Sequence, residues 1–195
     1  QTTCKERCFM NKRKYVLVVI GLLLGIITSG ILGYSYSRNN TIYLTGESTV
    51  YNMYLCSREI YQGLYDESAD VSYHLTYAAL LLQKAHSQLD SSLSFSFGID
   101  SRKSFAGNME DLSILILYGG SYGESYIRPA SQVKDDMTQA EVSFYQGLIK
   151  IIDSIVYQHL SIEDDPYSVS FTSMGIYDLR NIAYDFQVKT AALLQ

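Results

Sequence analysis

The hydrophobic positions divide the chain into one unbroken apolar stretch and a series of amphipathic segments. Residues 15–34 contain no charged side chain, and Lys12, Arg13 and Lys14 stand directly before them. A helix of this length, at ~1.5 Å per residue, spans the ~30 Å hydrocarbon core of a bilayer. Because positive charge stays on the cytoplasmic side, we expect residues 1–14 inside, a transmembrane helix over 15–34, and the following residues outside.

A cleaved signal peptide is the alternative interpretation of this stretch. Its small-residue pairs fit an A-x-A cleavage pattern poorly, which favours an uncleaved, single-pass anchor in the cell membrane. The chain begins with Gln, and Met10 fits a translation start. We therefore expect residues 1–9 to be an upstream extension or a cloning remnant without a role.

Small side chains recur at every fourth position of the apolar stretch, at Gly21, Gly25, Ser29 and Gly33. Such a stripe lets two membrane helices approach closely. We predict that it packs against a second copy of the chain or against a different membrane protein. The alternative is the ordinary abundance of glycine in membrane helices.

Beyond a linker over 35–45, with a break near Asn39 and Asn40, apolar residues recur at helical spacing. The clearest seam is Val71, Leu75, Ala78, Leu82, Ala85 and Leu89. The spacing predicts helices near 46–66, 68–93, 108–118, 134–160 and 173–193. These elements predict an all-α fold, in which the membrane helix precedes an extracytoplasmic antiparallel bundle of four to five helices over 46–195.

Local signals mark the ends of these helices. Thr138 and Glu141 form a capping-box pattern, and Asn108 and Ser173 are predicted to cap the helices that follow them. Residues 94–107 lose the helical period, which predicts a short strand or an ordered loop. We also expect a flexible loop over 119–123 and a loop over 161–172.

The charge of the predicted outer part excludes one class of partner. From Ser35 onward there are 10 Lys and Arg against 19 Asp and Glu, so the formal charge is 10 − 19 = −9. This charge repels nucleic acid, and we predict no nucleic-acid partner. The same part holds one cysteine, Cys56, on an apolar stripe, which predicts a buried thiol, with an intermolecular disulfide as the alternative. Low cysteine use and the residue bias suggest a bacterial surface.

Known catalytic and metal-binding motifs are absent from the sequence. His74, His86 and His159 lack metal-ligand spacing, and the acidic run 163–165 lacks the calcium-loop pattern. Neither a nucleophile elbow nor a phosphate-binding loop is found. We therefore predict no cofactor, no metal and no enzymatic activity.

Exposed aromatic residues on irregular backbone are typical of binding surfaces. The predicted contact surface comprises Phe95, Phe97, Phe105, Tyr118, Tyr122 and Tyr126. Tyrosines on the helices near 46–66 and 68–93 either pack at bundle edges or line a groove. The layout resembles the sensing half of four-helix-bundle receptors in architecture alone.

The favoured function is a non-enzymatic membrane protein that binds another protein through its outer bundle, as an accessory or scaffold subunit. The alternatives are a sensory-type module for a small ligand or the cell wall, and an envelope hydrolase. We expect the partner to be a foreign protein or a second copy.

Overall fold

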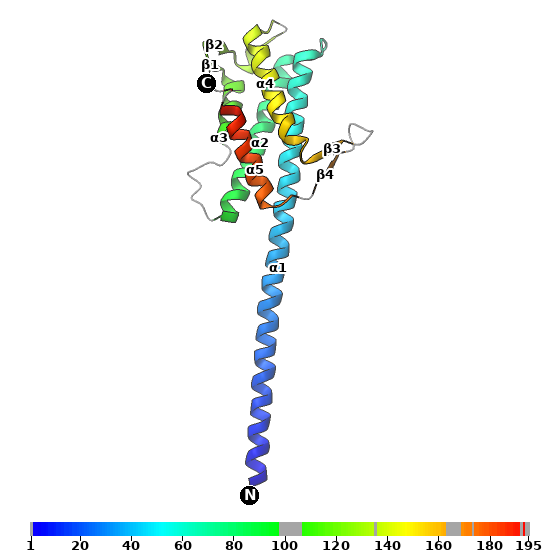
Figure 1. Ribbon diagram of the computed structural model, residues 1–195, viewed down its shortest axis with the longest axis vertical. Helices are drawn as coiled ribbons and strands as arrows, with labels where there is room; N and C mark the ends of the chain where they lie inside the picture. Colours follow the sequence, from blue (N-terminus) through cyan, green and yellow to red (C-terminus); the bar gives the residue numbers. More distant parts are fainter. Residues whose placement is uncertain are drawn as a thin grey trace. The chain divides into compact units, whose positions relative to one another are not determined.

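The computed structural model describes residues 2–97, 107–134, 136–162, 169–172, 174–191 and 193. Its side chains are described from residue 18 onward, apart from 94–97 and 162. This part of the chain is mostly helical, with short antiparallel strand pairs β1–β2 and β3–β4 (Figure 1). The elements are α1 (Thr2–Tyr65), α2 (Val71–Phe97), α3 (Gly107–Tyr118), β1 (Gly120–Tyr122), β2 (Ser125–Ile127), η1 (Ala130–Gln132), α4 (Gln139–Val156), β3 (Leu160–Ile162), β4 (Val169–Phe171) and α5 (Ile176–Ala191).

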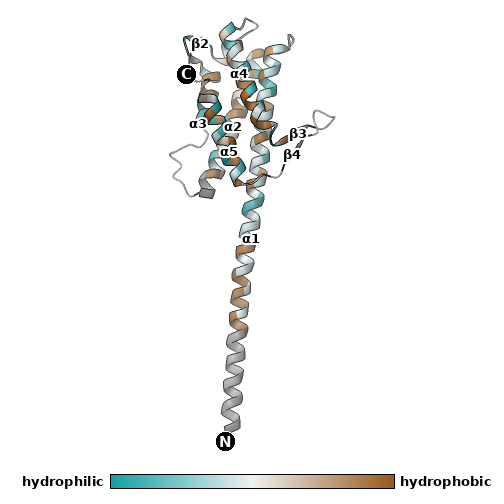
Figure 2. Ribbon diagram, in the orientation of Figure 1, coloured by the Kyte–Doolittle hydropathy of each residue, from teal (hydrophilic) through white to brown (hydrophobic). Residues whose placement is uncertain are grey.

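The chain forms two compact units, Gln1–Thr41 and Ile42–Gln195. The first unit is helical and carries the apolar stretch, seen as the brown band of α1 in Figure 2. From Val18 onward, where side chains are described, its large apolar side chains are exposed; Leu22, for example, is 63% exposed. By length and composition, α1 holds an apolar stretch long enough to cross a membrane. The predicted helix break is wrong, because Asn39 and Asn40 lie within α1.

The second unit is a helical bundle in which α1 and α4 run in opposite directions, because Ser57 bonds to Asp153 and Tyr65 bonds to Gln146. Hydrogen bonds join Asn52 to Gln88 between α1 and α2, and Ser57 to Asp153 between α1 and α4. The predicted apolar seam of α2, from Val71 to Leu89, is buried throughout. Met53, Cys56 and Ile60 of α1 are fully buried as well. The periodicity of apolar residues therefore identified the core-facing side of α2, and the apolar stripe that holds Cys56 lies on the core-facing side of α1.

The start of α4 has the predicted capping box. The Thr138 side chain accepts from the Glu141 backbone N–H, and the Glu141 carboxylate accepts from the Thr138 N–H. The same carboxylate is fully buried and accepts two hydrogen bonds from the Arg128 guanidinium, at 2.8 and 2.9 Å. Arg128 also contacts Asp136, so this network fixes the segment between β2 and α4. The sequence pattern had revealed only the cap.

Two of the predicted loops contain strands instead. Gly120–Tyr122 pairs with Ser125–Ile127, and Leu160–Ile162 pairs with Val169–Phe171. The first hairpin turns through Gly123, whose φ of 56° is readily adopted only by glycine. The backbone of residues 94–97 belongs to α2 rather than to a strand or loop. The acidic run 163–165 and the predicted cap Ser173 lie outside the described residues.

Asn108 does not cap α3, because that helix already includes Gly107. Its side-chain amide donates instead to α5, to the Gln187 carbonyl at 3.1 Å and the Thr190 hydroxyl at 2.9 Å. Asn108 therefore joins two helices that are far apart in sequence.

Candidate functional site

The residues of the predicted contact surface are placed differently from one another. Phe95 and Phe97 lie in the last turn of α2, where their side chains are not described, and Phe105 lies outside the described residues. Tyr118 at the end of α3 is 71% exposed, and Tyr126 on β2 is 58% exposed.

Tyr122 lies on β1 and packs inward. Its ring meets the ring of the buried Phe144 edge-on, with centroids 5.1 Å apart. In the described part of the predicted surface, Tyr118 and Tyr126 thus remain as large exposed side chains. Tyr118 ends α3, and Tyr122 and Tyr126 lie on paired strands, so the expectation of irregular backbone at these residues is wrong.

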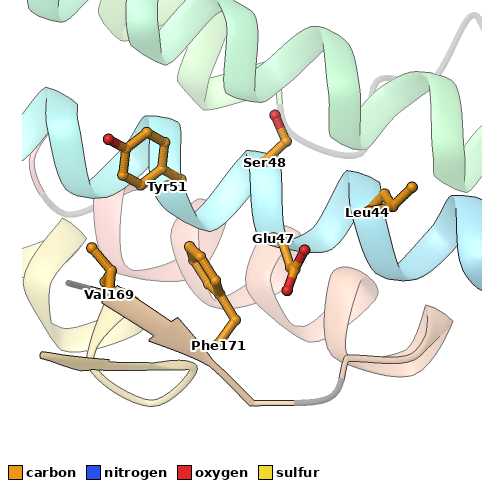
Figure 3. A pocket seen from close by; sticks show the side chains of 6 residues that line it. All are labelled: Leu44, Glu47, Ser48, Tyr51, Val169 and Phe171. Carbon is orange, nitrogen blue, oxygen red and sulfur yellow. The ribbon is translucent and has the colours of Figure 1, made fainter. Parts of the chain in front are cut away.

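A groove between α1 and β4 was not predicted from the sequence (Figure 3). It has a volume of about 370 Å³ and is lined by Leu44, Glu47, Ser48, Tyr51, Val169 and Phe171. The rings of Tyr51 and Phe171 meet edge-on, with centroids 6.4 Å apart. Since the strand that completes the groove was interpreted as a loop, sequence reasoning missed it. The alternation Val169-Ser170-Phe171 was the available signal, because alternating residues share one face of a strand.

Glu47 is the acidic group of this groove, and it is half-buried. Tyr43, one helical turn earlier, donates its hydroxyl to the Glu47 carboxylate, and this hydrogen bond raises the pKa of Tyr43. Among the described side chains, no basic group is paired with Glu47. The groove therefore combines apolar and aromatic walls with one carboxylate that has no cationic partner among the described side chains.

Two tyrosine pairs flank the turn between α1 and α2. Tyr61 and Tyr65 lie at the end of α1 with ring centroids 4.7 Å apart, and Tyr73 and Tyr77 stack at the start of α2 at 6.1 Å. Their exposed fractions range from 39% to 59%. Each pair exposes aromatic surface together with hydroxyl groups that can form hydrogen bonds.

The two histidines of α2 each lie close to a carboxylate on a neighbouring helix. His74 Nδ1 lies 2.7 Å from Glu59 Oε2, which joins α2 to α1, and His86 lies 3.5 Å from Glu110 of α3. His159 is half-buried before β3. Within the described ranges, no group of three or more His, Cys, Asp or Glu residues is arranged to hold a metal ion.

Cys56 occupies the interior of the second unit and is fully buried. Burial raises the pKa of its thiol, with a smaller contribution from the nearby Glu59 carboxylate. A buried, protonated thiol is a poor nucleophile. This geometry matches the predicted inert core cysteine.

The predicted membrane stripe lies along α1. A Cβ atom built on Gly21, Gly25 or Gly33 would meet no atom within 4 Å in the described structure. The use of this stripe for helix packing remains a prediction. Comparisons of the chain with protein-family models, curated proteins and solved structures give no match.

Proposed function

We propose that the chain is a non-enzymatic, membrane-anchored protein whose bundle lies outside the cytoplasm and binds another protein as an accessory or scaffold subunit. The observation that carries this proposal is the pair of exposed tyrosine clusters beside the α1–α2 turn. Tyrosine is enriched at protein interfaces and in their energetic hot spots, because it combines a large apolar ring with a hydroxyl.

Two further features support the proposal. The apolar stretch of α1 is long enough to anchor the chain, and the basic residues before it favour a cytoplasmic N-terminus. The stripe at Gly21, Gly25, Ser29 and Gly33 offers a second contact within the membrane. A partner that also spans the membrane would then contact the chain in both environments.

Site-specific photocrosslinking in cells tests this function. The photoreactive residue p-benzoylphenylalanine replaces Tyr61 or Tyr77 in the full-length protein, and the crosslinked products are identified after purification from membranes. Tyr184, which is 65% exposed on α5, provides a matched control position outside the two pairs. We expect one foreign protein to be captured at positions 61 and 77 and to be absent at position 184.

Two outcomes would overturn the proposal of a foreign partner. Crosslinks only between copies of the chain would identify a homo-oligomer. The absence of position-specific crosslinks at both tyrosine pairs would show that these tyrosines do not form the binding surface.

A further inference from the structure

The groove between α1 and β4 has a lining that suits a long side chain with an apolar stem and a charged head. Its walls are formed by Leu44, Val169 and the rings of Tyr51 and Phe171. Lysine and arginine have long aliphatic stems that pack on apolar surface, and charged heads that are attracted to aromatic faces and carboxylates. A volume of about 370 Å³ lies near the lower end of the range for small binding sites.

The negative charge of Glu47 favours a positively charged occupant of the groove. Glu47 is half-buried, and Tyr43, a neutral hydroxyl, is its described hydrogen-bond partner. A cation in the groove would supply the missing counter-charge and form a charge-assisted hydrogen bond. From Ser35 onward, 19 acidic residues outnumber 10 basic residues, and this negative charge also favours the approach of a basic partner.

The backbone beside the groove favours an extended occupant. β4 pairs with β3 alone in the described sheet, so one of its edges is unpaired. The Thr172 N–H donates to the His159 carbonyl, so these two residues form a hydrogen-bonded pair. Along the strands, hydrogen-bonded and non-hydrogen-bonded pairs then alternate, and Val169 and Phe171 belong to non-hydrogen-bonded pairs. In an antiparallel ladder this alternation turns the backbone groups of Val169 and Phe171 toward the unpaired edge. Strand addition uses backbone groups that point outward in this way.

We propose that the groove receives a lysine or arginine side chain from an extended segment of the partner protein, which pairs with the free edge of β4. This inference rests on the proposed protein-binding function and adds the chemistry of the partner. The stem lies against the paired rings of Tyr51 and Phe171, and the charged head meets the Glu47 carboxylate. Phe171 belongs to the pairing strand, so backbone pairing and side-chain insertion occur at the same place.

A pair of short peptides tests the proposal with the full-length protein in zwitterionic lipid nanodiscs. The first is acetyl-Ser-Val-Arg-Val-Ser-amide, and the second carries citrulline, which has the shape of arginine without its charge. The protein is labelled with 4-fluorophenylalanine, and a Phe171→Leu variant assigns the fluorine signal of residue 171. We expect the arginine peptide to shift this signal saturably, and the citrulline peptide to bind about tenfold more weakly.

Substitutions then test whether the preference for the arginine peptide over the citrulline peptide arises in the groove. Glu47→Gln should abolish the preference for arginine over citrulline, because the neutral amide no longer attracts the cation. Glu67→Gln removes one exposed carboxylate from the turn after α1 and should leave the preference unchanged. An arginine peptide with N-methylated backbone amides should bind more weakly if strand pairing contributes.

Several results would overturn the inference. Equal binding of both peptides would show that charge does not contribute to binding. If Glu47→Gln kept the preference for arginine, the cation would bind at a site other than Glu47. If free butylguanidinium bound as tightly as the peptide, the occupant would be a small molecule. Photocrosslinking from position 44 in cells separates the two proposals: a partner captured at positions 61 and 77 but not at 44 would overturn this inference alone.

Discussion

Glu141 is a buried carboxylate that remains ionised because its partners compensate for burial. Burial raises its pKa, but hydrogen bonds from Arg128 and from the backbone of Thr138 and Arg128 outweigh that effect and lower it to about 2. The ordinary value is 4.5. Since the folded-state pKa lies below the unfolded one, the network stabilises the fold above pH 4.5 and loses this contribution as the pH falls toward about 2.

The variant Glu141→Gln should therefore be less stable at neutral pH, and its stability should depend less on pH over that window. We expect a loss of about 2 kcal/mol at neutral pH, after allowance for solvent screening of the partly exposed Arg128. Urea unfolding followed by near-ultraviolet circular dichroism in maltoside micelles measures this difference. Asp136→Asn, which removes an exposed partner of the same arginine, should cost less than about 1 kcal/mol. Equal losses in both variants would contradict this assignment.

Cys56 should react with thiol reagents only after the bundle unfolds. In a Cys4→Ser/Cys8→Ser background, we expect no maleimide addition to the native protein, because the thiol is fully buried and its pKa is raised. Mass spectrometry should detect complete addition in concentrated urea. Rapid reaction of the native protein would instead support the alternative that this stripe faces a partner.

Among the elements, the contact between α3 and α5 depends on Asn108. Asn108→Ser keeps a small polar side chain but shortens it, so it loses both hydrogen bonds to α5. We expect the free energy of unfolding to fall by about 1 kcal/mol. The same substitution should cost less in a Thr190→Val background, where one acceptor is already absent. No change in stability would show that the inter-helix hydrogen bonds contribute little.

The helices were predictable because the regular spacing of apolar residues indicates which side of each helix is buried. Leu75, Leu82 and Leu89 recur every seven residues, and all are fully buried. The hairpins were not predictable from such repetition, because each strand has only three residues. Val169 and Phe171 alternate with one serine between them, which is too short a pattern to distinguish a strand from a loop. The groove was therefore missed together with the strand that forms its wall.

Contacts between elements were also hidden from the sequence. Glu141 was recognised as part of a local cap, since its cap partner lies three residues away. Its salt bridge to Arg128 depends on how β2 and η1 turn the chain, and no spacing rule encodes that path. The tyrosines were ambiguous for the same reason: Tyr54 is buried, whereas Tyr61 is 49% exposed on the same helix.

At the scale of the whole molecule, orientation in the membrane is the property to test first. In a Cys4→Ser/Cys8→Ser background, Ser68→Cys places a thiol in the exposed turn after α1 and Thr3→Cys places one near the N-terminus. A membrane-impermeant maleimide applied to intact cells should label position 68, whereas position 3 should be labelled only after lysis. The opposite pattern would reverse the proposed orientation.

The long sequence separation between α1 and its partners has a consequence for biosynthesis. Ser57 bonds to Asp153 and Arg58 to Tyr157, 96 and 99 residues later, and Tyr51 meets Phe171. A ribosome adds residues in order, so α1 emerges well before the side chains that cover this face exist. The nascent helix must remain uncovered until α4 and β4 have been made. Chaperones that protect exposed apolar segments therefore have a defined interval in which to act, and the bundle closes only when the last third of the chain arrives.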